Sequence, residues 1–111
     1  MALNYLPLVA YFFGGAFLMN TLPHLVSGVM GRRFPSPFAK PPGKGQSSAL
    51  TNFFWGFANL IVGYLLVAHV GDFDVRNWEH VGALGLGMFL IGLLTASHFS
   101  SLNGGRGPDL A

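Results

Sequence analysis

The feature that most constrains this chain is a set of three long stretches that carry no charge. They run from Met1 to Gly31, from Leu50 to Val70 and from Val81 to Phe99, and the six Lys and Arg and four Asp and Glu residues all lie outside them. A helix rises about 1.5 Å per residue, so roughly 20 apolar residues cross the ~30 Å hydrocarbon core of a bilayer. Backbone amides in lipid must be satisfied within their own segment, which makes a helix the expected form of each stretch.

The composition agrees with membrane spans. Hydrophobic residues make up 51% of the 111 residues and charged residues only 9%, against about 25% in ordinary soluble domains. A soluble protein this small has too little interior to bury so much apolar material. The sequence therefore predicts an all-α integral membrane bundle of three transmembrane helices, a single membrane domain over 1–111, with the lipid bilayer as its surroundings and no nucleic-acid partner.

The three spans are expected at about 5–22, 50–70 and 81–99. Pro23 follows the first span, and because proline removes a helical hydrogen bond we expect a bend there and a short interfacial helix after it. Residues 100–111 are expected to form a disordered tail. The spans hold no Asp, Glu, Lys or Arg, which argues against a proton-coupled transporter. The absence of Cys excludes disulfides and thiolate metal sites.

The two connecting loops differ in charge, and this difference predicts the orientation. Loop 32–48 has four cations and no acid, whereas loop 71–80 has one cation, Arg76, and three acids. Short loops rich in Lys and Arg remain in the cytoplasm. We therefore expect loop 32–48 inside, loop 71–80 outside, the N-terminus outside and the C-terminus in the cytoplasm of a bacterial inner membrane.

Loop 32–48 is long for a connector and contains four prolines, at positions 35, 37, 41 and 42. We predict that it folds back as an ordered cap in which Phe34 and Phe38 dip into the membrane interface. Its cations are candidate contacts for an anionic lipid or a partner protein: Arg32, Arg33, Lys40 and Lys44. The alternative is a mobile linker whose charges only set the topology.

Small and amide residues recur along one face of each expected helix. In the second span this stripe comprises Asn52, Gly56, Asn59 and Gly63. Glycines let helix backbones approach and buried amides hydrogen-bond across the contact, so we expect the stripe to lie between helices. A polar substrate path through Asn52 and Asn59 is the alternative. Matching stripes are expected in the first span (Ala10, Gly14, Thr21 and Gly28) and in the third (Gly82, Gly85, Gly92 and Ala96).

The four histidines fall at two depths, with His24 and His98 near the inner face and His69 and His80 near the outer one. Facing histidines at two depths are typical of bis-histidine haem b sites. However, His80 and His98 lie opposite the glycine stripe of the third span, so they face outward if that stripe faces the bundle. Anchoring at the membrane interface is the other interpretation. No acid lies at the depth of His24 and His98 to orient a base, so no hydrolytic enzyme is expected.

Residues 20–66 contain a Pro-His pair, the run GRRFPSPFA and the run PPGKG. With these motifs the segment resembles a family of uncharacterised small multi-pass inner-membrane proteins of bacteria. The resemblance implies a bacterial inner-membrane location and no known activity. A looser resemblance to the three-helix anchor subunits of succinate dehydrogenases carries over no haem or quinone residue.

Three functions are compatible with these features. The first is a structural or accessory subunit that packs with itself, as a homo-oligomer, or with a larger membrane protein complex, without a cofactor. The second is a membrane anchor that binds haem b or a quinone. The third is a small oligomeric pore or carrier that uses Asn52 and Asn59.

The charge asymmetry of the loops makes the orientation testable. Reporter fusions at residue 40 should be active in the cytoplasm and those at residue 75 outside it, because four cations hold loop 32–48 inside. The reverse pattern would overturn the orientation and the depths assigned to the histidines.

Overall fold

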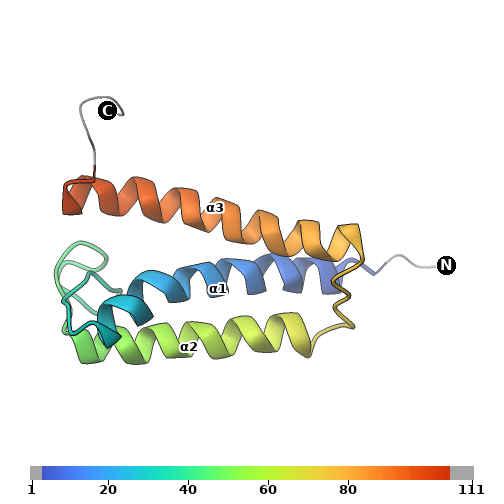
Figure 1. The fold of residues 1–111 in the computed structure, drawn as a ribbon, viewed down its shortest axis with the longest axis horizontal. Coiled ribbons are helices and arrows are strands. Elements are labelled where there is room, and N and C mark those ends of the chain that lie inside the picture. The colour runs from blue at the N-terminus through green and yellow to red at the C-terminus, as the bar shows by residue number, and fades with distance from the viewer. Residues whose placement is uncertain (1–3, 106–111) are drawn as a thin grey trace.

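The structure, a computed structural model, describes residues 4–105. It consists of three helices, α1 (Leu6–Val29), α2 (Ala49–Ala68) and α3 (Trp78–Asn103), and Figure 1 shows them side by side. Each is long and apolar enough to cross a membrane, and the described residues form no strand beyond one isolated bridge. The predicted all-α architecture with three membrane-spanning helices is confirmed.

The helix ends differ from the expected spans at two places. α1 continues through Pro23 to Val29, so the separate interfacial helix expected after the first span is instead the last part of α1. α3 continues to Asn103 and ends where Gly104 takes a left-handed conformation at φ 72°, which glycine adopts without steric cost. Residues 100–103 of the expected tail are therefore helical, and residues 106–111 lie outside the described part of the chain.

Side-chain caps define where α2 and α3 begin. Ser48 precedes α2, and its hydroxyl oxygen accepts a hydrogen bond from the backbone N–H of Thr51 at 3.1 Å. Asn77 precedes α3, and its side-chain oxygen accepts from Glu79 N and His80 N. Both residues satisfy amides that have no partner inside the helix.

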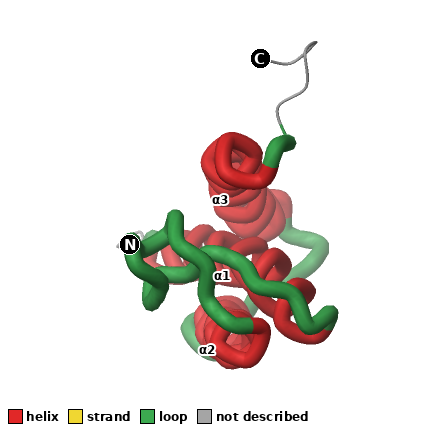
Figure 2. The backbone as a smooth tube through the Cα atoms, turned by 90° about the vertical axis from the view of Figure 1, so that its left-hand side faces the viewer, coloured by secondary structure: helices red, strands yellow, loops and turns green. Residues whose placement is uncertain are grey.

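α1 is the central helix. It packs against α2 on one side and α3 on the other, whereas α2 and α3 make almost no contact with each other. Figures 1 and 2 show this order, with α1 between its two neighbours. The arrangement is a layer and not a closed triangle, so a groove remains between α2 and α3.

The α1–α2 contact is a close approach of backbones. The buried residues of α2 are the four members of its stripe, Asn52, Gly56, Asn59 and Gly63. A Cβ at Gly56 would lie 2.5 Å from the backbone nitrogen of Leu25, and one at Gly63 would lie 2.7 Å from Cγ of Leu18. The glycines are needed because any side chain there would force the helices apart.

The small-residue stripe expected in the third span faces the bundle only at Gly92, where a Cβ would contact Met19 of α1 at 3.6 Å, so the prediction is wrong for its other members. A Cβ at Gly82 or Gly85 would meet nothing within 4 Å, and Ala96 is exposed. Gly87, on another face, is the buried residue of α3, and a Cβ there would fall on the carbonyl of Phe12 in α1. A single glycine allows this close approach, so Gly82, Gly85 and Ala96 are free to face lipid.

This difference between glycines predicts the outcome of matched substitutions. Gly56→Leu and Gly87→Leu should each lower the free energy of unfolding by about 1–3 kcal/mol, the usual cost of overpacking. Gly85→Leu, also in a helix but in open space, is the control and should change it little. Thermal unfolding in detergent measures all three. Equal stability of the Gly85 and Gly87 variants would contradict the α1–α3 packing.

Candidate functional site

Loop 32–48 is folded into a compact cap over one end of the helices. Phe34 and Ser47 form an antiparallel bridge, with N–O distances of 3.2 and 3.0 Å, and the hydroxyls of Ser36 and Ser47 share a hydrogen bond of 2.6 Å. The carbonyl of the buried Ser36 accepts from Gly43 N at 2.8 Å. Figure 2 looks onto this cap, which crosses in front of α1.

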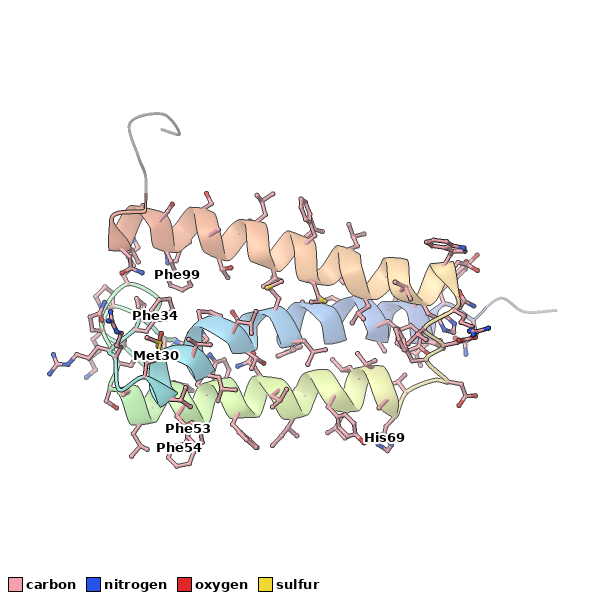
Figure 3. All side chains as sticks on the ribbon, viewed as in Figure 1. Met30, Phe34, Phe53, Phe54, His69 and Phe99 are labelled. Atoms are coloured by element: carbon pink, nitrogen blue, oxygen red, sulfur yellow. The ribbon has the colours of Figure 1, made fainter. Side chains whose placement is uncertain are left out.

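Phe34 and Phe38 were both expected to enter the membrane interface. In the structure they lie in different environments. Phe34 turns inward, with its ring centroid 4.6 Å from that of Phe99 and 5.6 Å from that of His24; Figure 3 shows Phe34 and Phe99 at this end of the molecule. Phe38 is 64% exposed and packs its ring on Trp55. Phe34 is therefore a core residue, and only Phe38 is available to the surroundings.

Asn52 joins the cap to α1 and α2. Its fully buried amide nitrogen donates to the carbonyl oxygens of Phe34 at 2.8 Å and Ser48 at 3.0 Å. Its amide oxygen lies 2.7 Å from Nδ1 of His24. Because the amide nitrogen is committed to two carbonyls, the amide oxygen acts as acceptor, and His24 therefore carries its proton on Nδ1.

The hydrogen bond that His24 donates to Asn52 determines which ring nitrogen of His24 is left as an acceptor. His24 is only 3% exposed, and within residues 4–105 its second ring nitrogen, Nε2, has no hydrogen-bond partner. In the neutral imidazole this nitrogen is an acceptor. His24 lines a hollow of about 470 Å³, so an unpartnered acceptor of determined tautomer lies at the wall of this hollow.

The cavity exists because the cap fills only the end of the groove between α2 and α3. α1 contributes Asn20 and His24, α2 contributes Trp55, and the cap and α3 supply the remaining walls. A second hollow of about 480 Å³ continues along the groove and shares Asn20, Trp55 and Leu94 with the first. Its other walls are apolar, with Phe12, Phe13, Phe17, Leu90 and Ile91 among them. Together they form a groove with a polar end and an apolar extension.

Polar groups at the floor of the groove are partly committed to the chain itself. Asn20 Nδ2 donates to Asn59 Oδ1 at 3.1 Å, and Asn59 Nδ2 donates to the carbonyl of Trp55 at 2.8 Å. In contrast, Nε1 of Trp55 is buried without a hydrogen-bond partner. An unpaired buried donor is costly, so Trp55 is a second place where this site lacks a partner that the chain does not supply.

The histidines lie in two pairs at opposite ends of the molecule, as expected. His80 and His98 were expected to face outward if the glycine stripe of the third span faced the bundle, and that condition is not met. His98 lines the same cavity as His24, and its Nε2 donates to the carbonyl of Gly43 at 2.7 Å. The prediction that His80 faces outward is also wrong, because its ring lies 4.9 Å from that of the buried Tyr11. His69, labelled in Figure 3 at the far end of α2, is bonded to Tyr64 on the surface.

The remaining candidates lie elsewhere. Arg32, Arg33, Lys40 and Lys44 are exposed on the cap. Trp55 lines both hollows. Asn20 was not a candidate, although its spacing of four residues from His24 places both on one face of α1 and is a signal in the sequence. No protein family, curated protein or solved structure matches the chain.

The central role of Asn52 predicts how the cap responds to substitution. Asn52→Leu leaves Nδ1 of His24 without a partner and removes one of two hydrogen bonds at each of the carbonyls of Phe34 and Ser48, which costs about 1–3 kcal/mol. Trypsin should then cleave after Lys44 about tenfold faster than in the unaltered protein. Asn59→Leu removes an amide of the same helix that does not touch the cap, so cleavage should stay slow. Equal rates in the two variants would show that Asn52 does not hold the cap.

Proposed function

We propose that this chain binds a lipid-soluble molecule whose polar head is held at His24 and whose apolar body lies along the groove between α2 and α3. The observation that carries the proposal is the unpartnered Nε2 of the buried residue His24, whose tautomer is determined by Asn52. Each of the two hollows falls within the ~300–1,000 Å³ range of small-molecule sites.

The chemistry of the site specifies the head group. Nε2 of neutral His24 accepts a hydrogen bond from a hydroxyl, and Nε1 of Trp55 is a donor without a partner beside it. Phe12, Phe17 and Leu90 then contact an apolar ring or chain. A hydroxyl-bearing ring with an alkyl tail, the class to which alkylphenols and quinols belong, supplies the donor that Nε2 needs and an apolar body for the groove.

We further propose that the protein resides in a bacterial inner membrane with the cap in the cytoplasm. The four cations of loop 32–48 against the single cation of loop 71–80 support this orientation. The resemblance of residues 20–66 to small bacterial membrane proteins supports the location. A ligand that dissolves in the bilayer reaches the site sideways, through the opening between α2 and α3.

A second candidate function is that of an accessory subunit, and the packing of α3 favours it. α3 buries one glycine against α1 and presents its other faces outward. A transmembrane helix of a partner, or of a second copy, fits the same groove as the proposed ligand. The two functions therefore compete for one surface, and a binding experiment separates them.

Haem b is a third candidate for the groove, beside the lipid-soluble ligand and a partner helix. A hydrogen bond from Nδ1 to an amide oxygen is also how iron-bound imidazoles are oriented. His98 would be the natural second ligand, but its Nε2 is bonded to Gly43. The cap would therefore have to rearrange before both histidines could bind one iron.

Fluorescence of Trp55 tests the proposal. In a Trp78→Phe background Trp55 is the sole tryptophan, and a bromine-substituted alkylphenol, whose hydroxyl can donate to His24, should quench it saturably in lipid nanodiscs. His24→Ala should weaken binding about tenfold, as expected for one lost hydrogen bond in a buried site. His69→Ala, at the other end of the molecule, should leave the affinity unchanged.

Competition separates head-group recognition from partitioning into lipid. A dodecylphenol should displace the bromophenol, whereas dodecylbenzene, which has the same tail and no hydroxyl, should not. Equal displacement by the two would overturn the proposed role of His24. A Soret band in the purified protein would replace the proposal by haem binding, and quenching that never saturates would leave the accessory-subunit function.

A further inference from the structure

The cap carries an unbalanced positive charge. Arg32, Arg33, Lys40 and Lys44 are all exposed, and the sequence has no Asp or Glu between His24 and Gly71 or between Val81 and Gly105. The carboxylates of the described residues, Asp72, Asp74 and Glu79, all lie in the opposite loop or the first turn of α3. Within residues 4–105 the cap therefore has no acidic side chain to balance its charge.

The cations sit on a surface that is already folded. Lys44 and Gly45 both donate their backbone N–H to the carbonyl of Pro41, at 3.1 and 2.8 Å. Arg32 N donates to the carbonyl of Ser27 at 2.9 Å, which continues the end of α1. Since the backbone is ordered before anything binds, an external anion does not have to order it.

Exposed apolar side chains accompany the cations at this end. Phe38 and Leu50 are each 64% exposed, Phe38 between the two pairs of cations in the chain and Leu50 in the first turn of α2. Met30, next to the arginines, is exposed too, and Figure 3 shows it at the cap end. A soluble anion or an acidic protein would pair with the charges but leave separate apolar groups in water.

We infer that the cap is a binding surface for anionic phospholipid headgroups. The phosphates pair with Arg32, Arg33, Lys40 and Lys44, while Phe38, Leu50 and Met30 enter the acyl boundary beneath them. This division between charged heads and apolar stems is what the membrane interface accommodates. The surface is separate from the cavity at His24, so the inference does not depend on the proposed ligand.

Quenching by brominated lipids measures which lipid gathers at each end. A Leu50→Trp, Trp55→Phe, Trp78→Phe chain reports on the cap, and a Trp55→Phe chain, in which Trp78 is 89% exposed, reports on the opposite end. In bilayers that mix the two lipids, brominated phosphatidylglycerol should quench the cap reporter more strongly than brominated phosphatidylcholine. We expect a relative affinity of about fivefold or more at low salt, falling as salt is added.

Charge variants identify the groups responsible. Replacing Lys40 and Lys44 together by Gln, or Arg32 and Arg33 together by Gln, should each lower the relative affinity at the cap several-fold. Arg76→Gln, at the other end, is the matched control and should leave it unchanged. Circular dichroism and slow cleavage after Lys44, or after Arg33 in the lysine variant, verify that each variant is folded.

Each remaining outcome overturns the inference. Equal quenching by the two lipids at the cap, or equal selectivity at both ends, would mean that the cap does not recognise anionic lipid. Selectivity that survives removal of all four cations would assign it to other groups. Loss of selectivity in phosphate but not in chloride of equal ionic strength would make free phosphate the ligand. An acidic protein that binds the cap while lipid selectivity is absent would make the surface a protein interface.

Discussion

The hydrogen bonds of Asn52 hold the cap, α1 and α2 together at one end of the molecule. One buried amide group binds two carbonyls at the ends of the cap and the ring of a histidine from a different helix. Without Asn52, no side chain of α2 would hydrogen-bond both to the cap and to α1. Because such amides are unfavourable in an apolar interior unless every group is paired, the site is stable only in the arrangement that satisfies all of them.

The central position of α1 explains why a cavity is present at all. Glycines on opposite sides of α1 and its neighbours allow both α2 and α3 to approach it closely, which leaves α2 and α3 themselves apart. The cap closes one end of the resulting groove, and His98 ties α3 to it through Gly43. The cap therefore adds walls to the polar end of the groove, and both this end and the apolar length remain open to the surroundings.

The proposed ligand site lies in the groove between the helices, and the proposed lipid-binding surface lies on the exposed cap. His24 and Trp55 lack partners within a largely apolar groove, which suits a lipid-soluble ligand with one polar head. The cations of the cap lie on an exposed surface and have no acidic neighbour among the described residues, which suits the headgroups of the surrounding bilayer. Both features place the protein's chemistry at the cap end, although the opposite loop carries more titratable groups for its length.

The sequence by itself determined the fold class and one helix contact. Three uncharged stretches of membrane-spanning length leave a helix as the only form that satisfies their backbone. The period of Asn52, Gly56, Asn59 and Gly63 marks one face of α2, and the structure buries that face. Such features are local, because length, charge and helical periodicity depend on neighbours within a few turns.

Only the tertiary structure decided what these helices enclose. Spacing could not show that Gly87, and not the stripe of Gly82 and Gly85, faces α1, because a helix that meets lipid on most sides has several faces of similar polarity. For the same reason the direction of His98 and the inward turn of Phe34 could not be read from the chain. The tautomer of His24 depends on an amide 28 residues away, and contacts over that distance are set by how the helices pack.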